Sequence, residues 1–443
     1  MSTLMSVAAH PATTFAVPVV FKVVAWVIGL LGLGAAFDMT AANAALKIIY
    51  PQKEITKTLY RNNPFLGLVP KRTDFYGLNI QLALRYALTG GASPVFATAQ
   101  ANKTPSSLAK FNVTSVKYYS LASIDGETIR ATKNDKGALV QALENETDAA
   151  LWRLKRNLAI DLFRSGTGSI GKISAGSNVG TATITLATIQ DITNFEKGNL
   201  LVASLADGGA LRSAGATVTI TGIDRSLGTL TASGNWSAGI AAVAAGDFLY
   251  QVGDAANGGA NVKLSGLAAW DPVTAPSATT FFGLDRTSDV TRLGGVRYNG
   301  AGAPIEETLV NALALVCREG GDPSHVFLNN QDYVNLVLAL GSKVIYDQEQ
   351  TDIPEVGFSA VKLAAPGASG FVKVFADPNC PKGFAWILQM DTWTLWTREE
   401  IGFLMDDDQR ILREATADSY ELRMGYYGQL ACVAPGYNCA VTL

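Results

Sequence analysis

Residues 111–166 join two side-chain patterns in one unbroken stretch, FNVTSVKYYSLASIDGETIRATKNDKGALVQALENETDAALWRLKRNLAIDLFRSG. The first third is rich in β-branched and aromatic residues and reaches a turn signal at Asp125-Gly126, which predicts a β-strand. Beyond an N-cap at Asn134 or Asp135, apolar residues recur at three- and four-residue steps from Leu139 to Leu162, which predicts an amphipathic helix. About 30 helical residues make a rod on the order of 45 Å long. Such a rod suits a bracing element.

A second strand precedes this stretch and predicts a β-ribbon within residues 71–125. Apolar and polar side chains alternate from Leu78 to Tyr86, and the strand ends at the Gly- and Pro-containing segment 89–94. A two-stranded ribbon is marginal in water by itself, so it must pack on its own domain or on a neighbouring subunit, and its length favours the neighbour. The predicted subunit interface consists of Leu78, Ile80, Leu82, Leu84, Tyr86, Lys103, Lys110, Phe111 and Tyr118.

The rest of the chain divides by composition. Residues 39–70 contain three prolines and no long period, which predicts an extended N-terminal arm. Residues 169–258 are rich in Gly, Ala, Ser and Thr with five short β-runs, which predicts an inserted all-β domain. Residues 259–390 alternate between helix and strand patterns: a helix ending at Gly320, a strand at His325–Leu328, and a helix opening at Asn329 or Asn330. Closing strands are predicted within 391–443.

Residues 1–38 contain an apolar run, FAVPVVFKVVAWVIGLLGLGAAF, from Phe15 to Phe37. It is long enough to cross a bilayer, but Pro18 and Lys22 interrupt it, and no Lys or Arg precedes it as a secretory signal requires. Three interpretations stay open: synthesis that starts at Met39, which we favour, a removable leader, and a genuine signal or anchor. Because a single anchor fits nothing downstream, we expect no membrane association.

Composition bounds the function. A chain of 443 residues suits two or three domains, and only 16% charged residues with a mean hydropathy of +0.18 indicates apolar surface that faces partners. The formal net charge of −3 lacks the basic excess that sequence-specific or tight DNA binding requires. Four cysteines without a CxxC pair and two histidines, His10 and His325, predict neither a zinc site nor a disulfide framework.

The familiar catalytic motifs are missing. The sequence contains no GxSxG, HExxH, P-loop or Rossmann glycine motif. The glycine-rich segment 165–171 follows a helix rather than a strand and lacks a lysine, and Asp406-Asp407-Asp408 does not have the alternating ligand spacing of a calcium loop. His325 is expected to be structural. We therefore predict no enzyme, no catalytic residue, no metal site and no cofactor.

The order of these elements resembles the HK97-like major capsid proteins of tailed bacteriophages. The resemblance covers about residues 39–443, and its strongest pieces are NNPFLGLVPK at 62–71, residues 111–165, and ILQMDTWTLWT at 387–397. It implies an α+β fold with an extended β-ribbon loop at 71–125, a peripheral-domain spine helix at 126–168, an inserted small all-β domain at 169–258, an axial domain at 259–390, and closing peripheral strands at 391–443.

The resemblance also implies a function. Copies of the chain would associate as hexamers and pentamers of an icosahedral shell, with a portal and possible scaffolding or cement proteins as further partners. The shell would be assembled in the host cytoplasm, would become part of the virion, and would enclose double-stranded DNA without sequence-specific binding. Two alternatives are an encapsulin-like compartment shell around a cargo enzyme and a secreted β-rich surface protein. An enzyme is the least favoured class.

Overall fold

A computed structural model describes residues 63–127, 136–341, 346–350, 357–364, 366–406 and 409–443, and it confirms the predicted α+β class. Three buried apolar clusters organise the chain: one beneath the long helix, one in a seven-stranded sheet, and one in a separate β-module. The apolar run at 15–37 and nearly all of the predicted arm lie outside the described residues. Among the described residues, no helix combines the length and apolar character needed to cross a membrane.

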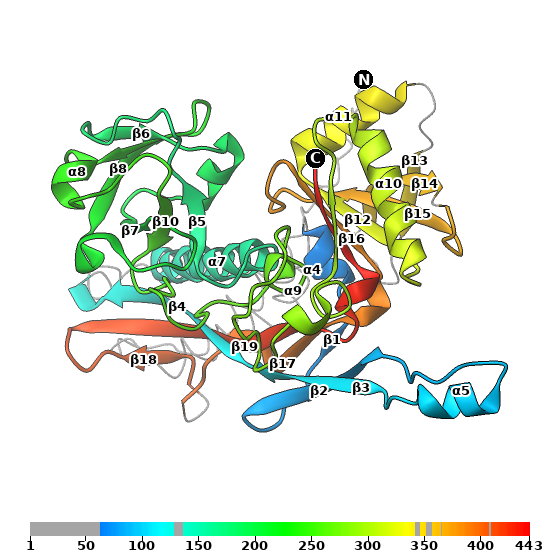
Figure 1. The fold of residues 1–443 in the computed structure, drawn as a ribbon. Coiled ribbons are helices and arrows are strands. Elements are labelled where there is room, and N and C mark those ends of the chain that lie inside the picture. The colour runs from blue at the N-terminus through cyan, green and yellow to red at the C-terminus, as the bar shows by residue number, and fades with distance from the viewer. Residues whose placement is uncertain (1–62, 128–135, 342–345, 351–356, 365, 407–408) are drawn as a thin grey trace, which may run out of the picture.

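The long helix, α7, spans Lys136–Asp161 and confirms the helix prediction. Its 26 residues make a rod of roughly 39 Å. Leu151, Leu154 and Leu158 on one side are buried against the strand β4 (Val116–Asp125), which runs beneath the helix in Figure 1. The predicted N-cap residues, Asn134 and Asp135, lie outside the described part of the chain.

A five-stranded sheet carries this helix on one face. It consists of β4, β1 (Lys71–Arg72), β17 (Trp393–Phe403), β18 (Ile411–Arg413) and β19 (Ser419–Cys432), with β19 paired to β4 on one edge and to β17 and β18 on the other. The burial pattern of β4 alternates strictly along its length. Its opposite face is therefore exposed.

The predicted ribbon is shorter than expected. Its two strands, β2 (Asn79–Ala87) and β3 (Ser107–Thr114), pair antiparallel, and the short helix α5 (Phe96–Ala101) lies at the tip. The predicted return strand breaks at Ser115, because β4 leaves the ribbon and pairs with β19 over ten residues. In Figure 1 the ribbon projects from the body of the molecule with α5 at its far end.

A mixed seven-stranded sheet forms the second body of the molecule. Its strand order is β11 (Val296–Asn299), β20 (Cys439–Thr442), β16 (Phe384–Leu388), β12 (His325–Leu328), β15 (Phe371–Ala376), β14 (Gly357–Ala364) and β13 (Tyr346–Gln350), and α10 (Ile305–Arg318) and α11 (Asn330–Leu340) pack on it. Both predicted helices and the strand between them are confirmed, and the Asn329 side chain caps α11 by accepting a hydrogen bond from the Gln331 N–H.

The C-terminal strand differs from the expected boundary. We expected all of 391–443 to close the peripheral domain, yet β20 lies between β11 and β16 of the seven-stranded sheet. A 3₁₀ turn at Pro435–Tyr437 redirects the chain after β19. Cys439, Ala440 and Val441 are buried there, and the strand gains a hydrogen-bonded neighbour on each edge.

The inserted β-module contains the five predicted strands and one more. Its strands are β5 (Ser169–Lys172), β6 (Thr183–Thr185), β7 (Leu200–Ser204), β8 (Val218–Asp224), β9 (Thr229–Ala232) and β10 (Phe248–Gln251), with the short helix α8 (Trp236–Gly239). Phe195 and Trp236 lie in its own buried core. Because Ser169 pairs with Tyr250, the entry and exit of the module lie side by side. The short helices α4 (Pro64–Leu68) and α9 (Leu267–Trp270) pack into the core beneath α7.

Candidate subunit interface

The ribbon has a covered face and an open face. On the covered face, Ile80, Leu82 and Leu84 of β2 lie opposite Val113, Phe111 and Ala109 of β3. These β2 residues and Tyr86 are half-buried, whereas Leu78, Lys103 and Lys110 are exposed. The predicted interface residues therefore divide between the two faces, and the exposed ones remain candidates for contact with another subunit.

Phe111 is a correction to the predicted interface. Its side chain is completely buried, with its ring centroid 5.0 Å from that of Trp270 and 6.3 Å from that of Phe281. The rings of Trp270 and Phe281 contact each other in turn at 5.0 Å. The apolar face at the ribbon root thus packs on its own subunit, because residues 267–284 supply the core that the ribbon lacks.

Tyr118 is a second correction, because it belongs to β4 and points into the core. Its hydroxyl donates to Asp161 Oδ2 at 2.8 Å and accepts a hydrogen bond from the Leu264 N–H at 2.7 Å. Burial, with Asp161 nearby, raises the pKa of Tyr118 well above its usual value. Lys263 Nζ lies 5.1 Å from the centre of the Tyr118 ring. This cluster joins β4, the end of α7 and the segment that follows the inserted module.

The ribbon root is fixed by polar contacts as well. Arg398 Nη2 donates to the Gly77 carbonyl at 2.6 Å, and its guanidinium lies 5.2 Å from the centre of the Phe75 ring. The Asn112 N–H donates to the Phe282 carbonyl at 2.9 Å. The tip has no comparable support, since none of the six residues of α5 is buried.

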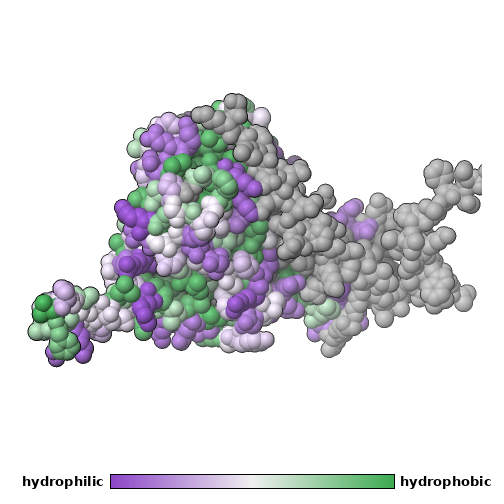
Figure 2. All heavy atoms as spheres, turned by 90° about the vertical axis from the view of Figure 1, so that its right-hand side faces the viewer, coloured by the Kyte–Doolittle hydropathy of each residue, from purple (hydrophilic) through white to green (hydrophobic). Residues whose placement is uncertain are grey.

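Several exposed apolar residues on the ribbon were missed by the sequence analysis. Phe96 at the tip is 81% exposed, and Leu108, on the open face opposite Arg85, is 68% exposed. Leu88 and Val95 are exposed too. The dipeptide Val95-Phe96, placed between Pro94 and a run of small residues, was a usable signal for an apolar tip. Figure 2 views the molecule from the side towards which the ribbon points and shows hydrophobic atoms interspersed with hydrophilic ones on that face.

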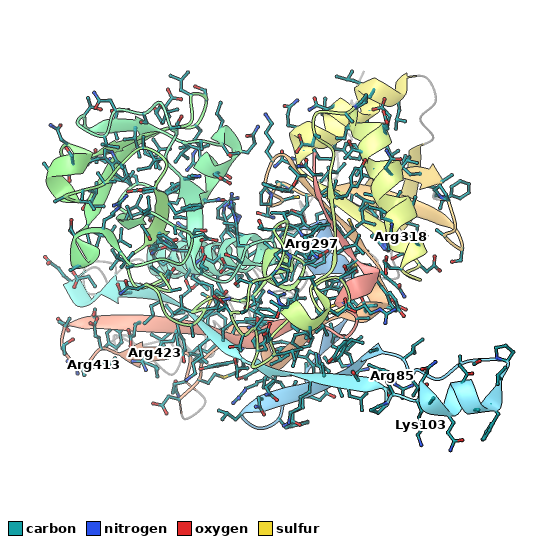
Figure 3. The ribbon with its side chains drawn as sticks, viewed as in Figure 1. Arg85, Lys103, Arg297, Arg318, Arg413 and Arg423 are labelled. Carbon is teal, nitrogen blue, oxygen red and sulfur yellow. The ribbon has the colours of Figure 1, made fainter. Side chains whose placement is uncertain are left out.

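The ribbon is also purely cationic. From Phe75 to Ile124 the sequence contains no Asp or Glu, but it contains Arg85, Lys103, Lys110 and Lys117. Figure 3 shows Arg85 along the ribbon and Lys103 at its tip. In a protein with a net charge of −3, these four cations give this stretch a local positive charge.

The point where the described chain begins is anchored in the protein interior. Asp377 is buried, and its Oδ2 accepts a hydrogen bond from the Phe65 N–H at the start of α4 at 3.3 Å. Its Oδ1 accepts from the Asn379 N–H at 2.9 Å, and Asn379 Nδ2 donates to Asn63 Oδ1 at 2.9 Å. Burial, which outweighs these hydrogen bonds, raises the pKa of Asp377 to about 6. The first described residues, Asn63 and Phe65, are thus held in place by the protein interior.

Other groups capable of chemistry lie in structural surroundings. Burial lowers the pKa of His325 to about 4, with Lys373 contributing, and its Nδ1 lies 2.7 Å from Ser324 Oγ. Cys380, Cys432 and Cys439 are buried free thiols, and Cys317 is partly exposed. Within the described ranges, no three His, Cys, Asp or Glu side chains are grouped as metal ligands. The backbone of Asp406 forms an isolated antiparallel β-bridge with Gln409. The other two residues of the acidic triplet lie outside the described residues.

Comparison with known proteins gave structural matches only. No protein-family model matches the chain, and no curated protein matches it. Among solved structures, the capsid of Cyanophage A-1(L) aligns at 12% identity over 86% of this chain and 93% of that chain, with a TM-score of 0.45. The capsid of a native GTA particle aligns at 8% identity over 86% of this chain and 90% of that chain, with a TM-score of 0.42. The capsid of Myoviridae phage XM1 aligns at 8% identity over 86% of this chain and 91% of that chain, with a TM-score of 0.41.

Proposed function

We propose that this chain is the major capsid protein of a tailed bacteriophage, a subunit that assembles with copies of itself into a closed icosahedral shell. The observation that carries the proposal is the ribbon, whose root is packed on its own subunit while its tip exposes Phe96, Val95 and Leu88. A two-stranded ribbon is at best marginally stable by itself, and its uncovered apolar residues favour contact with another surface. In a subunit of this kind, the surface is supplied by the next copy.

The other parts of the fold support the same role. The helix α7 braces the five-stranded sheet, and the seven-stranded sheet with α10 and α11 forms a second body suited to meet its copies around five- and six-fold axes. The contact between a projecting ribbon and a different surface of the next copy is heterologous, and such contacts close into rings when the rotation between copies allows it. Many modest contacts then act together in the finished shell.

The proposed shell encloses double-stranded DNA, and the charge of the chain bears on how tightly that DNA is held. With 35 basic and 38 acidic side chains, the chain has no excess of positive charge to hold nucleic acid tightly. Double-stranded DNA would therefore fill the interior without sequence-specific binding. A portal for DNA entry, scaffolding or cement proteins, assembly in the host cytoplasm and a final place in the virion complete the proposal.

Expression of the chain alone, followed by size-exclusion chromatography and negative-stain electron microscopy, tests this function. Closed shells, or rings of five and six copies, are expected. A protein that stays monomeric at high concentration, with and without a scaffolding protein, would contradict the proposal. Nuclease-protected DNA in particles from infected cells separates a genome container from a compartment that encloses an enzyme.

A further inference from the structure

A cleft of about 560 Å³ lies between α7 and the inserted β-module. Residues of α7 line one side of it and residues of the module line the other, at the opposite end of the molecule from the ribbon tip (Figure 1). Its volume lies within the range of about 300–1,000 Å³ that is usual for small-molecule sites. None of the predicted interface residues lines this cleft, so it needs an explanation of its own.

One row of side chains on α7 faces the cleft. Asp148, Trp152 and Arg156 follow one another at four-residue steps, which places them on the same side of the helix, and all three line the cleft. The Trp152 side chain is 57% exposed, and the Arg156 guanidinium lies 5.9 Å from the centre of its ring. The row therefore presents an exposed aromatic ring between a carboxylate and a guanidinium.

Amide side chains in the cleft are held in place by an arginine. Arg153 Nη2 donates to Gln251 Oε1 at 2.9 Å and to Asn199 Oδ1 at 3.4 Å. Because each amide accepts through its oxygen, its NH₂ group is left as a donor. Within the part of the chain that the structure describes, no hydrogen bond involves these two NH₂ groups or the side chain of Asn157, which lines the cleft from α7. The cleft therefore offers amide donors that have no partner.

The charges of the cleft are mixed, and several of them pair with one another. Lys263 Nζ lies 2.8 Å from Asp254 Oδ2 and 3.8 Å from Asp161 Oδ2, and Glu196 forms an ion pair with Arg225 at 3.0 Å. A strongly anionic ligand would meet carboxylates, and a cationic ligand would meet arginines. The cleft therefore favours a neutral ligand that both donates and accepts hydrogen bonds. The charged groups that line it are Glu146, Asp148, Asp161, Glu196, Asp254, Arg153, Arg156 and Lys263.

We propose that this cleft binds a neutral oligosaccharide, with one sugar ring stacked on Trp152 and its hydroxyls bonded to Asp148, Asn157 and Gln251. A pyranose ring presents a face of weakly positive C–H groups, which matches the negative face of an indole ring. Its hydroxyls donate to carboxylates and accept from amides, so one ring uses both kinds of group in the cleft. Donors that are already fixed lose little conformational entropy on binding. This inference goes beyond the proposed function, because a single subunit contains the whole cleft.

Binding of the purified full-length protein to an array of neutral and acidic oligosaccharides tests the proposal. We expect binding to at least one neutral hexose oligosaccharide, and the same sugar free in solution should bind in titration calorimetry. The measurement does not require shells, so its failure leaves the proposed function standing, and a failure to form shells leaves this test intact. If no neutral sugar binds, or if only acidic sugars bind and salt abolishes their binding, the proposal is overturned.

Variants of the exposed tryptophan locate the binding in the cleft. Trp152→Ala should weaken binding of the selected sugar roughly tenfold, whereas Trp152→Phe, which keeps an aromatic ring, should weaken it by roughly threefold at most. Tyr76→Ala is the matched control and should leave the affinity unchanged, because Tyr76 is an aromatic residue that is 81% exposed and lies outside the cleft. Circular dichroism and urea denaturation verify that each variant is folded. Equal affinities of Trp152→Ala and the wild type for the sugar would overturn the proposal.

Discussion

Tyr118 and Tyr119 are adjacent in sequence but lie on opposite faces of β4. Tyr118 is buried and bonded to Asp161 and the Leu264 N–H, whereas the Tyr119 hydroxyl is exposed and lies 3.2 Å from the Tyr427 hydroxyl. Removal of the Tyr118 hydroxyl leaves two buried groups without their partner, so Tyr118→Phe should lower the free energy of unfolding by about 2 kcal/mol. Tyr119→Phe is the control, with a change expected below about 0.5 kcal/mol. Urea denaturation of both variants gives the comparison, and equal effects would show that the buried Tyr118 hydroxyl contributes no more to stability than the exposed Tyr119 hydroxyl.

Asp377 makes the stability of the protein depend on pH. Its pKa is about 6 in the folded state, above the ordinary 3.8, so the folded protein binds this proton more tightly than the unfolded chain does. The free energy of unfolding should therefore fall as pH rises from about 4 to about 6, by roughly 3 kcal/mol from this group. Asp377→Asn should remove that component, so the stability of the variant relative to wild type should increase between pH 4 and 7.

Asp322 provides the matched control for this pH dependence. Hydrogen bonds from the Ser369 hydroxyl and N–H hold the pKa of Asp322 below its usual value, so it stays ionised across the same range. Asp322→Asn should therefore leave the slope of stability against pH unchanged from pH 5 to 7. Denaturation series at several pH values measure both slopes, and parallel curves for wild type and Asp377→Asn would refute the assignment.

Among the elements, those with a clear local period were predictable from the sequence. The leucine spacing predicted α7, and the alternation from Leu78 to Tyr86 predicted β2. The five β-runs predicted five of the six strands of the inserted module. The break at Ser115 could not be predicted, because β3 and β4 carry the same β-rich pattern and differ only in their partners. The partner of β4 is β19, about 300 residues away, and local sequence does not encode that pairing.

The inserted module should fold as an independent unit. It has its own buried core, its first and last strands pair with each other, and polar contacts of Arg153 in α7 and of Arg164 just beyond α7 connect it to the helix. We expect residues 169–252, expressed alone, to unfold cooperatively with urea and to show a β-type circular dichroism spectrum. Trp236 is completely buried in this core and reports unfolding by its fluorescence. A gradual transition, or fluorescence of an exposed tryptophan in native buffer, would contradict an autonomous core.

At the level of the whole molecule, the order of parts was predictable but the faces that meet solvent were not. The interface prediction was drawn from the apolar pattern of the ribbon and included Phe111 and Tyr118. The structure buries both because Trp270, Phe281 and Asp161 come from distant parts of the chain. Exposure is a property of tertiary contacts, so Leu78 and Phe111 look equivalent in the sequence although only Leu78 reaches the surface.

Assembly of the whole molecule should depend strongly on salt. If an acid-free cationic ribbon binds an acidic surface of the next copy, long-range attraction accelerates encounter at low ionic strength and is screened as salt rises. Light scattering should show the initial assembly rate falling roughly tenfold or more between about 0.05 and 0.5 M NaCl.

A variant with Arg85→Gln, Lys103→Gln and Lys110→Gln should assemble slowly at all salt concentrations, and its assembly rate should depend much less on salt. Because these three side chains are exposed, the variant monomer should keep wild-type stability in urea. A rate that rises with salt in both proteins would instead indicate that apolar burial alone limits association, and that the ribbon charge has another purpose.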